Sequence, residues 1–198
     1  MWHLFGTRTP DPQSSDEELL PALVRGDEAA FLIVYRRRKD AIYRYALQVT
    51  GSAETAREVT QEVFLELLRG ASRLDAELGS VRSWLYAVAR RKMLRQILAD
   101  RRYEPLGDEG AERADTTDLH RDLAEAQLTA RIREILPSLP AAYREVLVLC
   151  VVEGLSYAEA AHIADVPEGT IRSRLHRAKA MIAERLRPAL AVTERRNV

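Results

Sequence analysis

Basic side chains gather on one face of a predicted helix near the C-terminus. From Glu168 to Arg187 there are six Lys or Arg residues and only two acidic ones. At about 100° per residue, Ile171, Leu175 and Ala178 fall on one apolar side of this helix. Arginines and short polar groups contact phosphates and base edges when a helix enters the major groove of DNA. The side opposite the apolar stripe is therefore a candidate DNA-binding surface, formed by Arg172, Ser173, His176 and Arg177.

The segment before this helix predicts a second, shorter helix and a tight turn. Ser156 and Glu159 have the spacing of a capping box, so a helix is expected to start there and to end near Ala164. Pro167 fits the first position of the next helix, where a missing N–H has little effect. Two helices joined by so short a turn form a helix-turn-helix. The alternative, a basic surface helix in another kind of bundle, would not need these capping and turn signals.

A second candidate surface lies on the predicted helix of residues 54–69. Its apolar side consists of Ala56, Val59, Thr60, Val63, Phe64 and Leu67. Its opposite side carries Glu58, Gln61, Glu62 and Leu65. A leucine among acids and an amide can form a small protein-binding patch. Taken alone, these residues favour the simpler interpretation of a solvated helix face with one exposed leucine.

A third candidate surface belongs to residues 79–102, which are strongly basic. Ser80 or Ser83 could cap this helix, and Trp84 and Val88 face inward. Cations at this density suit contact with nucleic-acid phosphates, and an aromatic ring can serve as a platform for an unstacked base. A tryptophan within an apolar stripe is more often a core residue, so both interpretations of Trp84 stay open. The basic residues are Arg82, Arg90, Arg91, Lys92, Arg95, Arg101 and Arg102.

The elements that must position these residues are helices. The chain has 198 residues, of which 46% are hydrophobic and 6% aromatic, a composition that favours helices over strands. Apolar periodicity is helical throughout, with breaks at the glycines near residues 26, 51, 70 and 79. The sequence predicts an all-α fold of two small helical domains joined by a flexible acidic linker. The expected boundaries are a tail at 1–15, a first domain at 16–103, the linker at 104–118, a second domain at 119–187 and a tail at 188–198.

The formal net charge of zero conceals an uneven distribution of charge along the chain. Residues 71–103 contain eight basic and three acidic side chains, whereas residues 104–130 contain two and eight. Residues 131–198 are basic again, with eleven against eight. Two basic blocks separated by an acidic one indicate a polyanionic partner.

The residues that several classes of function require are absent from the sequence. No glycine-rich nucleotide loop or paired metal-binding histidines are present, and the single cysteine, Cys150, excludes an internal disulfide and a cysteine metal cluster. We expect Cys150 to be a buried small hydrophobe. No nucleophile and base can be paired, so we expect no catalytic residues, no enzymatic activity, no metal and no cofactor. No apolar run is long enough for a membrane span, and the N-terminus does not have the pattern of a secretory signal.

The three segments together resemble the extracytoplasmic-function group of bacterial RNA polymerase sigma factors. Residues 156–179 resemble the promoter-binding helix-turn-helix of that group. Residues 54–69 resemble the helix that docks on the coiled coil of the polymerase β′ subunit, and residues 79–102 resemble the promoter-melting helix with its preceding loop. Three positions depart from the family pattern, which more often has Gly at Asp165, Asp at Glu58 and Asn at Arg91.

The resemblance implies an alternative sigma factor that directs core RNA polymerase to specific promoters and helps to open them. Its implied partners are the β′ and β subunits, promoter DNA and an anti-sigma factor, with no small-molecule substrate and no direct membrane insertion. The implied location is the cytoplasm, or the inner membrane face when the anti-sigma partner holds it there. The implied minus-thirty-five residues are Arg172, Ser173, His176 and Arg177; the minus-ten residues are Arg73, Arg82, Trp84, Arg90, Arg91 and Arg95; the core-polymerase residues are Glu58, Gln61, Glu62 and Leu65.

Two other functions fit parts of the sequence. A plain DNA-binding regulator would use only the helix-turn-helix and would leave the patch around Leu65 without a role. A sigma mimic that titrates an anti-sigma protein usually carries a receiver domain, for which this chain has no room. Such a mimic would also need no cations on the recognition helix, yet they are present.

Overall fold

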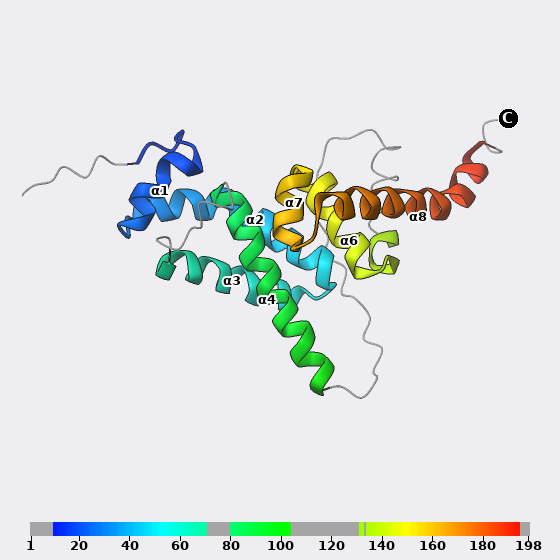
Figure 1. Ribbon diagram of the computed structural model, residues 1–198, viewed down its shortest axis with the longest axis horizontal. Helices are drawn as coiled ribbons and strands as arrows, with labels where there is room; N and C mark the ends of the chain where they lie inside the picture. The colour runs from blue at the N-terminus through cyan, green and yellow to red at the C-terminus, as the bar shows by residue number, and fades with distance from the viewer. Residues whose placement is uncertain (1–9, 71–79, 104–130, 133, 195–198) are drawn as a thin grey trace, which may run out of the picture.

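Every regular element of the described chain is a helix (Figure 1). The computed structural model describes residues 10–70, 80–103, 131–132 and 134–194. The all-α prediction is confirmed for this part of the chain. In chain order the elements are α1 (Asp16–Val24), α2 (Glu28–Thr50), α3 (Ala53–Gly70), α4 (Val81–Tyr103), the 3-10 helix η3 (Leu136–Ser138), α6 (Ala141–Leu147), the π-helix η4 (Val148–Val152), α7 (Tyr157–Ala164) and α8 (Glu168–Glu194).

The first four helices, here called the N-terminal half, begin and end close to the predicted breaks. Ser15 forms a capping box at the start of α1, and the Asp27 side chain accepts two backbone N–H groups at the start of α2. Gly51 ends α2 with a φ of 77°, a left-handed conformation that glycine adopts without steric penalty. Local capping and turn chemistry therefore explains where these helices start and stop.

Helix α2 runs through the centre of the N-terminal half and packs against α1, α3 and α4 (Figure 1). Periodicity correctly predicts the buried face of α3, because Ala56, Val59, Val63, Phe64 and Leu67 are each at most 3% exposed. Only Thr60 of that predicted face is half-buried. The fully buried ring of Tyr45 packs edge-on against Tyr86, with their centroids 5.2 Å apart.

The C-terminal half, from η3 to α8, contains the predicted helix-turn-helix. The capping box of Ser156 and Glu159 starts α7, which ends at Ala164 as expected. Asp165 then adopts a left-handed conformation with a φ of 51°. Helix α8 begins at Glu168 rather than Pro167, because the Pro167 carbonyl already accepts hydrogen bonds from the first turn and so occupies the flanking cap position.

Helix α8 continues further than the sequence predicts. A frayed tail is expected from Pro188, whereas the helix extends to Glu194. A proline inside a helix removes one backbone hydrogen bond and bends the axis, but it does not have to end the helix. Figure 1 shows a change of direction close to the C-terminal end of α8.

The two halves pack directly on each other. Helix α4 contacts α7, and α2 contacts α6 and η4. The buried apolar side chains of both halves form one hydrophobic cluster. The predicted linker at 104–118 lies outside the described residues, so the division into two domains joined by that linker remains a prediction. Among the helices that the structure describes, none is long and apolar enough to cross a membrane.

Candidate functional sites

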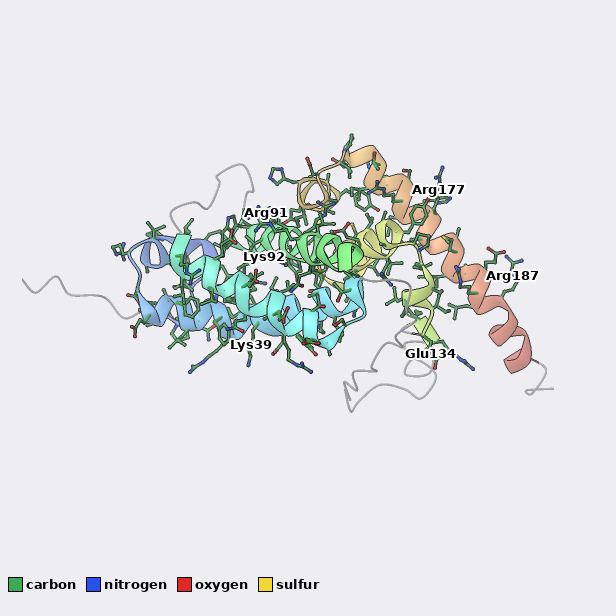
Figure 2. All side chains as sticks on the ribbon, turned by 90° about the horizontal axis from the view of Figure 1, so that it is seen from below. Lys39, Arg91, Lys92, Glu134, Arg177 and Arg187 are labelled. Atoms are coloured by element: carbon green, nitrogen blue, oxygen red, sulfur yellow. The ribbon has the colours of Figure 1, made fainter. Side chains whose placement is uncertain are left out.

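The predicted DNA-binding face of α8 lies open on the surface. The apolar stripe behind it is buried, with Ile171, Leu175 and Ala178 at most 4% exposed. Figure 2 shows Arg177 and Arg187 projecting from α8, away from Lys39 on the N-terminal half. The helix is thus fastened by one side and presents the other, which is the arrangement a groove-reading helix requires. The exposed residues on the open side are Arg172, Ser173, His176 and Arg177.

Two arginines of this face are held in place without being buried. The Arg172 guanidinium lies 2.7 Å from the Glu168 carboxylate and 5.6 Å from the centre of the Tyr157 ring on α7. The Arg177 guanidinium donates to the Tyr143 hydroxyl at 3.4 Å. Exposed contacts of this kind add little to stability. They do limit the conformations of long side chains, which reduces the entropy lost when a guanidinium binds a phosphate or a base.

Helix α4 presents only part of its predicted basic face. Arg91 and Arg95 are exposed. Arg82 and Arg90 are half-buried, and both contact the C-terminal half. The Arg90 Nε atom lies 2.9 Å from the Glu145 carboxylate, and the Arg82 guanidinium donates to the backbone carbonyl of Glu153.

Trp84 has a core position. Its ring is only 4% exposed, so it offers no face on which an unstacked base could lie. Of the two interpretations that the sequence leaves open for Trp84, its burial favours the core residue over the base platform, and Trp84 and Val88 belong to the same hydrophobic cluster. Arg73, another predicted minus-ten residue, lies outside the described residues.

Acids of α3 and cations of α4 form a network on one side of the predicted protein-binding patch. The Lys92 ammonium lies 3.1 Å from both the Glu62 and the Glu66 carboxylates, and Arg91 lies 3.2 Å from Glu66. Burial alone would raise the pKa of Glu66, but the hydrogen bonds and positive charges of Lys92 and Arg91 outweigh it and lower that pKa. The carboxylate therefore stays ionised and ties α3 to α4.

All four predicted residues of the α3 patch are exposed. The Gln96 amide donates a 2.6 Å hydrogen bond to the Glu58 carboxylate, so Glu58 and Glu62 each have a partner on α4. Gln61 and Leu65 instead border a hollow between α2 and α3. Leu65 is 37% exposed and its neighbour Leu68 is 55% exposed. The patch therefore has an acidic side linked to α4 and an apolar side that opens into the hollow.

The hollow has a volume of about 390 Å³ and an aromatic floor. The Tyr35 ring of α2 meets the Phe64 ring of α3 edge-on at 4.9 Å, and Lys39 lies 5.8 Å from the centre of the Tyr35 ring. Sequence reasoning missed the α2 side of this surface. A usable signal was present, because Phe31, Tyr35, Lys39 and Tyr43 recur at four-residue spacing, but nothing local shows which helix they face.

Cys150 is half-buried rather than buried as expected. It lies in η4 beside exposed Val151 and Val152. Partial burial raises the pKa of the Cys150 thiol, and the positive charge of Lys179 opposes that rise. A thiol with a raised pKa is a weak nucleophile, so the structure offers no argument for a reactive cysteine.

Comparisons with known proteins place both halves in one family. The model of Sigma-70 region 2 matches residues 34–103, and the model of Sigma-70, region 4 matches residues 129–182. The RNA polymerase sigma-H factor of Pseudomonas aeruginosa is 28% identical over 188 residues, which cover 90% of this chain and 97% of that protein. The ECF RNA polymerase sigma factor SigK of Mycobacterium tuberculosis is 32% identical over 174 residues, which cover 84% of this chain and 91% of that protein.

Solved structures share the fold. CnrH, solved in complex with the cytosolic domain of CnrY, has a TM-score of 0.65 and 23% identity, over 88% of this chain and 99% of that chain. The sigma factor RpoE, solved in complex with the anti-sigma factor NepR from Bartonella quintana, has a TM-score of 0.66 and 22% identity, over 77% of this chain and 94% of that chain. These likenesses support the helical architecture described above.

Proposed function

Since this chain belongs to the extracytoplasmic-function (ECF) group of RNA polymerase sigma factors, we propose that it binds core polymerase through α3 and reads promoter DNA through α8 and α4. As a member of that group it is an initiation factor that gives core RNA polymerase its promoter specificity. The observation that best supports this division of labour is the open face of α8, with its buried apolar stripe behind exposed Arg172 and Arg177. We further propose that the chain has no catalytic activity of its own and acts in the cytoplasm.

The α8 face suits the minus-thirty-five element. Arginine can donate two hydrogen bonds to guanine in the major groove, and serine or histidine can contact bases or phosphates nearby. Arg91 and Arg95 on α4 suit the phosphates of the minus-ten region in the arrangement described here, because both are exposed. Trp84 is left out of this proposal because of its burial.

The surface around Gln61 and Leu65 suits the β′ subunit. An exposed leucine beside an aromatic-floored hollow can accept apolar side chains of a partner helix, and the charged residues that line the hollow, Lys39, Asp40 and Arg57, can pair with charges on that helix. A plain DNA-binding regulator would have no use for this surface. The β′ contact is therefore the part of the proposal that best separates a sigma factor from the alternatives.

An anti-sigma partner is also part of the proposal. CnrH and RpoE, which share this fold, were solved bound to the cytosolic domain of CnrY and to the anti-sigma factor NepR. We expect such a partner to cover surfaces that polymerase needs, so the partner and core polymerase should compete. A complex containing the chain, its partner and core polymerase, each at full affinity, would contradict this.

The test uses the purified full chain with core RNA polymerase. Gln61→Ala combined with Leu65→Ala should weaken polymerase binding by at least tenfold, because truncating a single hot-spot side chain at a protein interface costs about 2 kcal/mol or more and a tenfold loss corresponds to about 1.4 kcal/mol. The matched control is Leu32→Ala, which also removes a leucine side chain from an exposed position, 45% exposed on α2, outside the residues that line the hollow. Binding is measured by titrating labelled chain with core enzyme, and promoter-specific transcripts from a selected library provide the functional measurement. Equal binding by the variant and the control would reject the proposed β′ surface.

A further inference from the structure

Tyr143, in the first turn of α6, contacts the DNA-binding face of α8 although it belongs to a different helix. Its ring packs against the hydrophobic cluster, so the residue is half-buried and packing fixes the direction of the ring. Its hydroxyl accepts a hydrogen bond of 3.4 Å from the exposed Arg177 guanidinium, 34 positions further along the chain. The phenol oxygen therefore lies at the edge of the predicted recognition surface.

The fold of the C-terminal half holds Tyr143 in this position. Leu136 and Leu139, which precede α6, are buried in the hydrophobic cluster. The Pro140 carbonyl accepts the backbone N–H of Tyr143 at 2.9 Å, and α6 packs against α8. The hydroxyl is thus placed before any ligand binds, and a donor that is already in place loses little entropy on binding.

The Tyr143 hydroxyl still has its own hydrogen atom to donate. A phenol can accept through its oxygen and donate through its O–H. Arg177 uses the oxygen as acceptor, and no acceptor for the O–H lies among the residues that the structure describes. A hydroxyl that accepts from a cation is polarised and becomes a stronger donor. This O–H is therefore available to an acceptor outside the chain.

Arg177 differs from Arg172 of the same face in how its charge is compensated. The Arg172 guanidinium lies 2.7 Å from the Glu168 carboxylate. Within the described part of the chain, no carboxylate pairs with Arg177, whose partner is the neutral Tyr143 phenol. Arg172 must weaken an ion pair when it binds an anion, whereas Arg177 loses none. An anionic ligand is therefore favoured at Arg177.

The place of Arg177 along α8 also favours a phosphate over a base. Recognition helices contact base edges mainly with their N-terminal residues. Arg172 lies near the start of α8, and Arg177 lies about 7.5 Å further along the axis at 1.5 Å per residue. Figure 2 shows Arg177 projecting from α8. A DNA backbone that borders the groove can meet Arg177 and Tyr143 together, because the two side chains are in contact.

We propose that Tyr143 is a DNA-binding residue and forms, with Arg177, a clamp for one phosphate of the minus-thirty-five DNA. In this Tyr143/Arg177 clamp the phenol O–H donates to a phosphate oxygen, and the guanidinium pairs with the same phosphate. The 3.4 Å bond is longer than most N–H···O bonds, so the guanidinium can turn toward a phosphate at little energetic cost. The inference rests on the proposed function, since it takes α8 as the helix that reads the promoter.

The two members of the clamp should contribute in different ways. Every DNA sequence has the same phosphates, so the clamp adds affinity and fixes the register of α8 without selecting a base. Arg177 is charged, and its contact with a phosphate releases a counterion. Tyr143 is neutral and releases none. The salt dependence of binding therefore distinguishes the loss of one residue from the loss of the other.

The test uses holoenzyme formed from the full chain and core RNA polymerase, with promoter DNA selected from a library. Tyr143→Phe removes only a hydroxyl and should weaken binding of every promoter variant about fivefold, without a change in salt dependence. Arg177→Gln should weaken binding and reduce the salt dependence by about one counterion. The matched control is Arg185→Gln, because Arg185 is also exposed on α8 and donates at 3.4 Å, to the Met181 carbonyl. The control should change neither the affinity nor the salt dependence.

A double-mutant cycle tests whether the two residues hold the same phosphate. In an Arg177→Gln chain, Tyr143→Phe should weaken binding less than about twofold, because residues that share a ligand have non-additive effects. Neutral methylphosphonate is then substituted for one phosphate at a time in the promoter DNA. One linkage should weaken binding of the wild-type chain when it is neutralised, and the same change should have no effect on the chain that carries both substitutions.

Several results would overturn the clamp. They are equal binding by Tyr143→Phe and the wild-type chain, a loss confined to one base position, and a full fivefold loss in the Arg177→Gln chain. Circular dichroism checks the fold, and an unfolded Tyr143→Phe chain would assign the hydroxyl to stability instead. Wild-type holoenzyme without promoter-specific binding would reject the proposed function and the clamp together. Promoter binding that Arg172→Ala weakens and Tyr143→Phe does not would reject the clamp alone.

Discussion

The Tyr86 hydroxyl on α4 donates a hydrogen bond of 2.6 Å to the carboxylate of Glu153, 67 positions further along the chain. Both residues are buried, with 2% and 9% exposed. Burial, and then the hydrogen bond and negative charge of Glu153, raise the pKa of Tyr86 well above its ordinary value. The hydroxyl therefore stays protonated and remains a donor across the physiological range. This bond links a predicted promoter-melting helix to the helix-turn-helix half.

Removal of the Tyr86 hydroxyl should destabilise the chain. Tyr86→Phe preserves the ring and leaves the buried Glu153 carboxylate without its donor, so we expect the free energy of unfolding to fall by about 2 kcal/mol. Urea unfolding followed by circular dichroism measures the change. Tyr157→Phe is the matched control, because that ring is exposed and should lose less than about 0.5 kcal/mol. Equal effects of the two substitutions would contradict the importance of the buried bond.

Stability should fall in alkaline solution. Burial and the charge of Glu145 raise the pKa of Tyr45, as burial and Glu153 raise that of Tyr86, although Arg90 and Arg82 oppose these shifts. Above about pH 10 the unfolded chain releases the phenolic protons while the folded chain keeps them, so stability is present below that pH and is lost as pH rises.

Unfolding free energies between about pH 8 and pH 11 check this dependence. Lys92 contributes in the same direction: burial alone would lower its pKa, but Glu66 and Glu62 outweigh burial and raise it. Tyr45→Phe with Tyr86→Phe should therefore reduce the alkaline decrease without abolishing it. If the free energy of unfolding falls with pH at the same rate in the wild-type chain and in this double variant, other groups account for the decrease.

Arg172→Ala should weaken binding of minus-thirty-five DNA. If the guanidinium contacts a base, we expect a loss of about 1–3 kcal/mol for the preferred sequence and less discrimination at one position. If it contacts a phosphate, all sequences should lose affinity and the salt dependence should become shallower by about one counterion. Holoenzyme binding to promoter variants at several salt concentrations distinguishes these outcomes. Arg185→Ala, at an exposed position further along α8, is the control. It should change neither the affinity for the promoter variants nor the salt dependence of binding.

Asp165→Gly should stabilise the helix-turn-helix. Asp165 has a φ of 51°, and a side chain in the left-handed region incurs a steric penalty that glycine does not have. After allowance for the greater freedom of glycine in the unfolded chain, we expect a gain of about 0.5–1 kcal/mol. Asp165→Ala is the paired variant and should lower stability, since alanine tolerates this conformation less well than aspartate. Thermal unfolding of the wild-type chain and the two variants checks the expected order of stability, with glycine highest and alanine lowest. An alanine variant more stable than the wild-type chain would refute the explanation.

Local patterns predict much of this molecule. The glycines at 26 and 51 and the cap of Ser156 indicate helix ends because the backbone conformations and N–H groups they satisfy lie within a few residues. Helical periodicity likewise separates the buried Ile171 stripe from the exposed arginines of α8, since a wheel depends only on spacing. These features need no knowledge of what packs against the helix.

Other features depend on residues far apart in the chain. Arg90 and Arg91 are adjacent and chemically identical, yet Arg90 meets Glu145 of the other half while Arg91 meets Glu66 on α3. The hollow beside Leu65 is lined partly by residues of α2, and the sequence of α3 alone cannot predict that lining.

The sequence by itself determined the helices, their caps and the outward cationic face of α8, because hydrogen bonds and side-chain spacing within one turn decide them. Only the tertiary structure decided which of the described arginines are exposed and that Trp84 is a core residue. It also decided that the carboxylates of Glu145 and Glu153 bind side chains of α4. Those outcomes depend on burial and pairing between segments whose contact is set by packing of the whole chain.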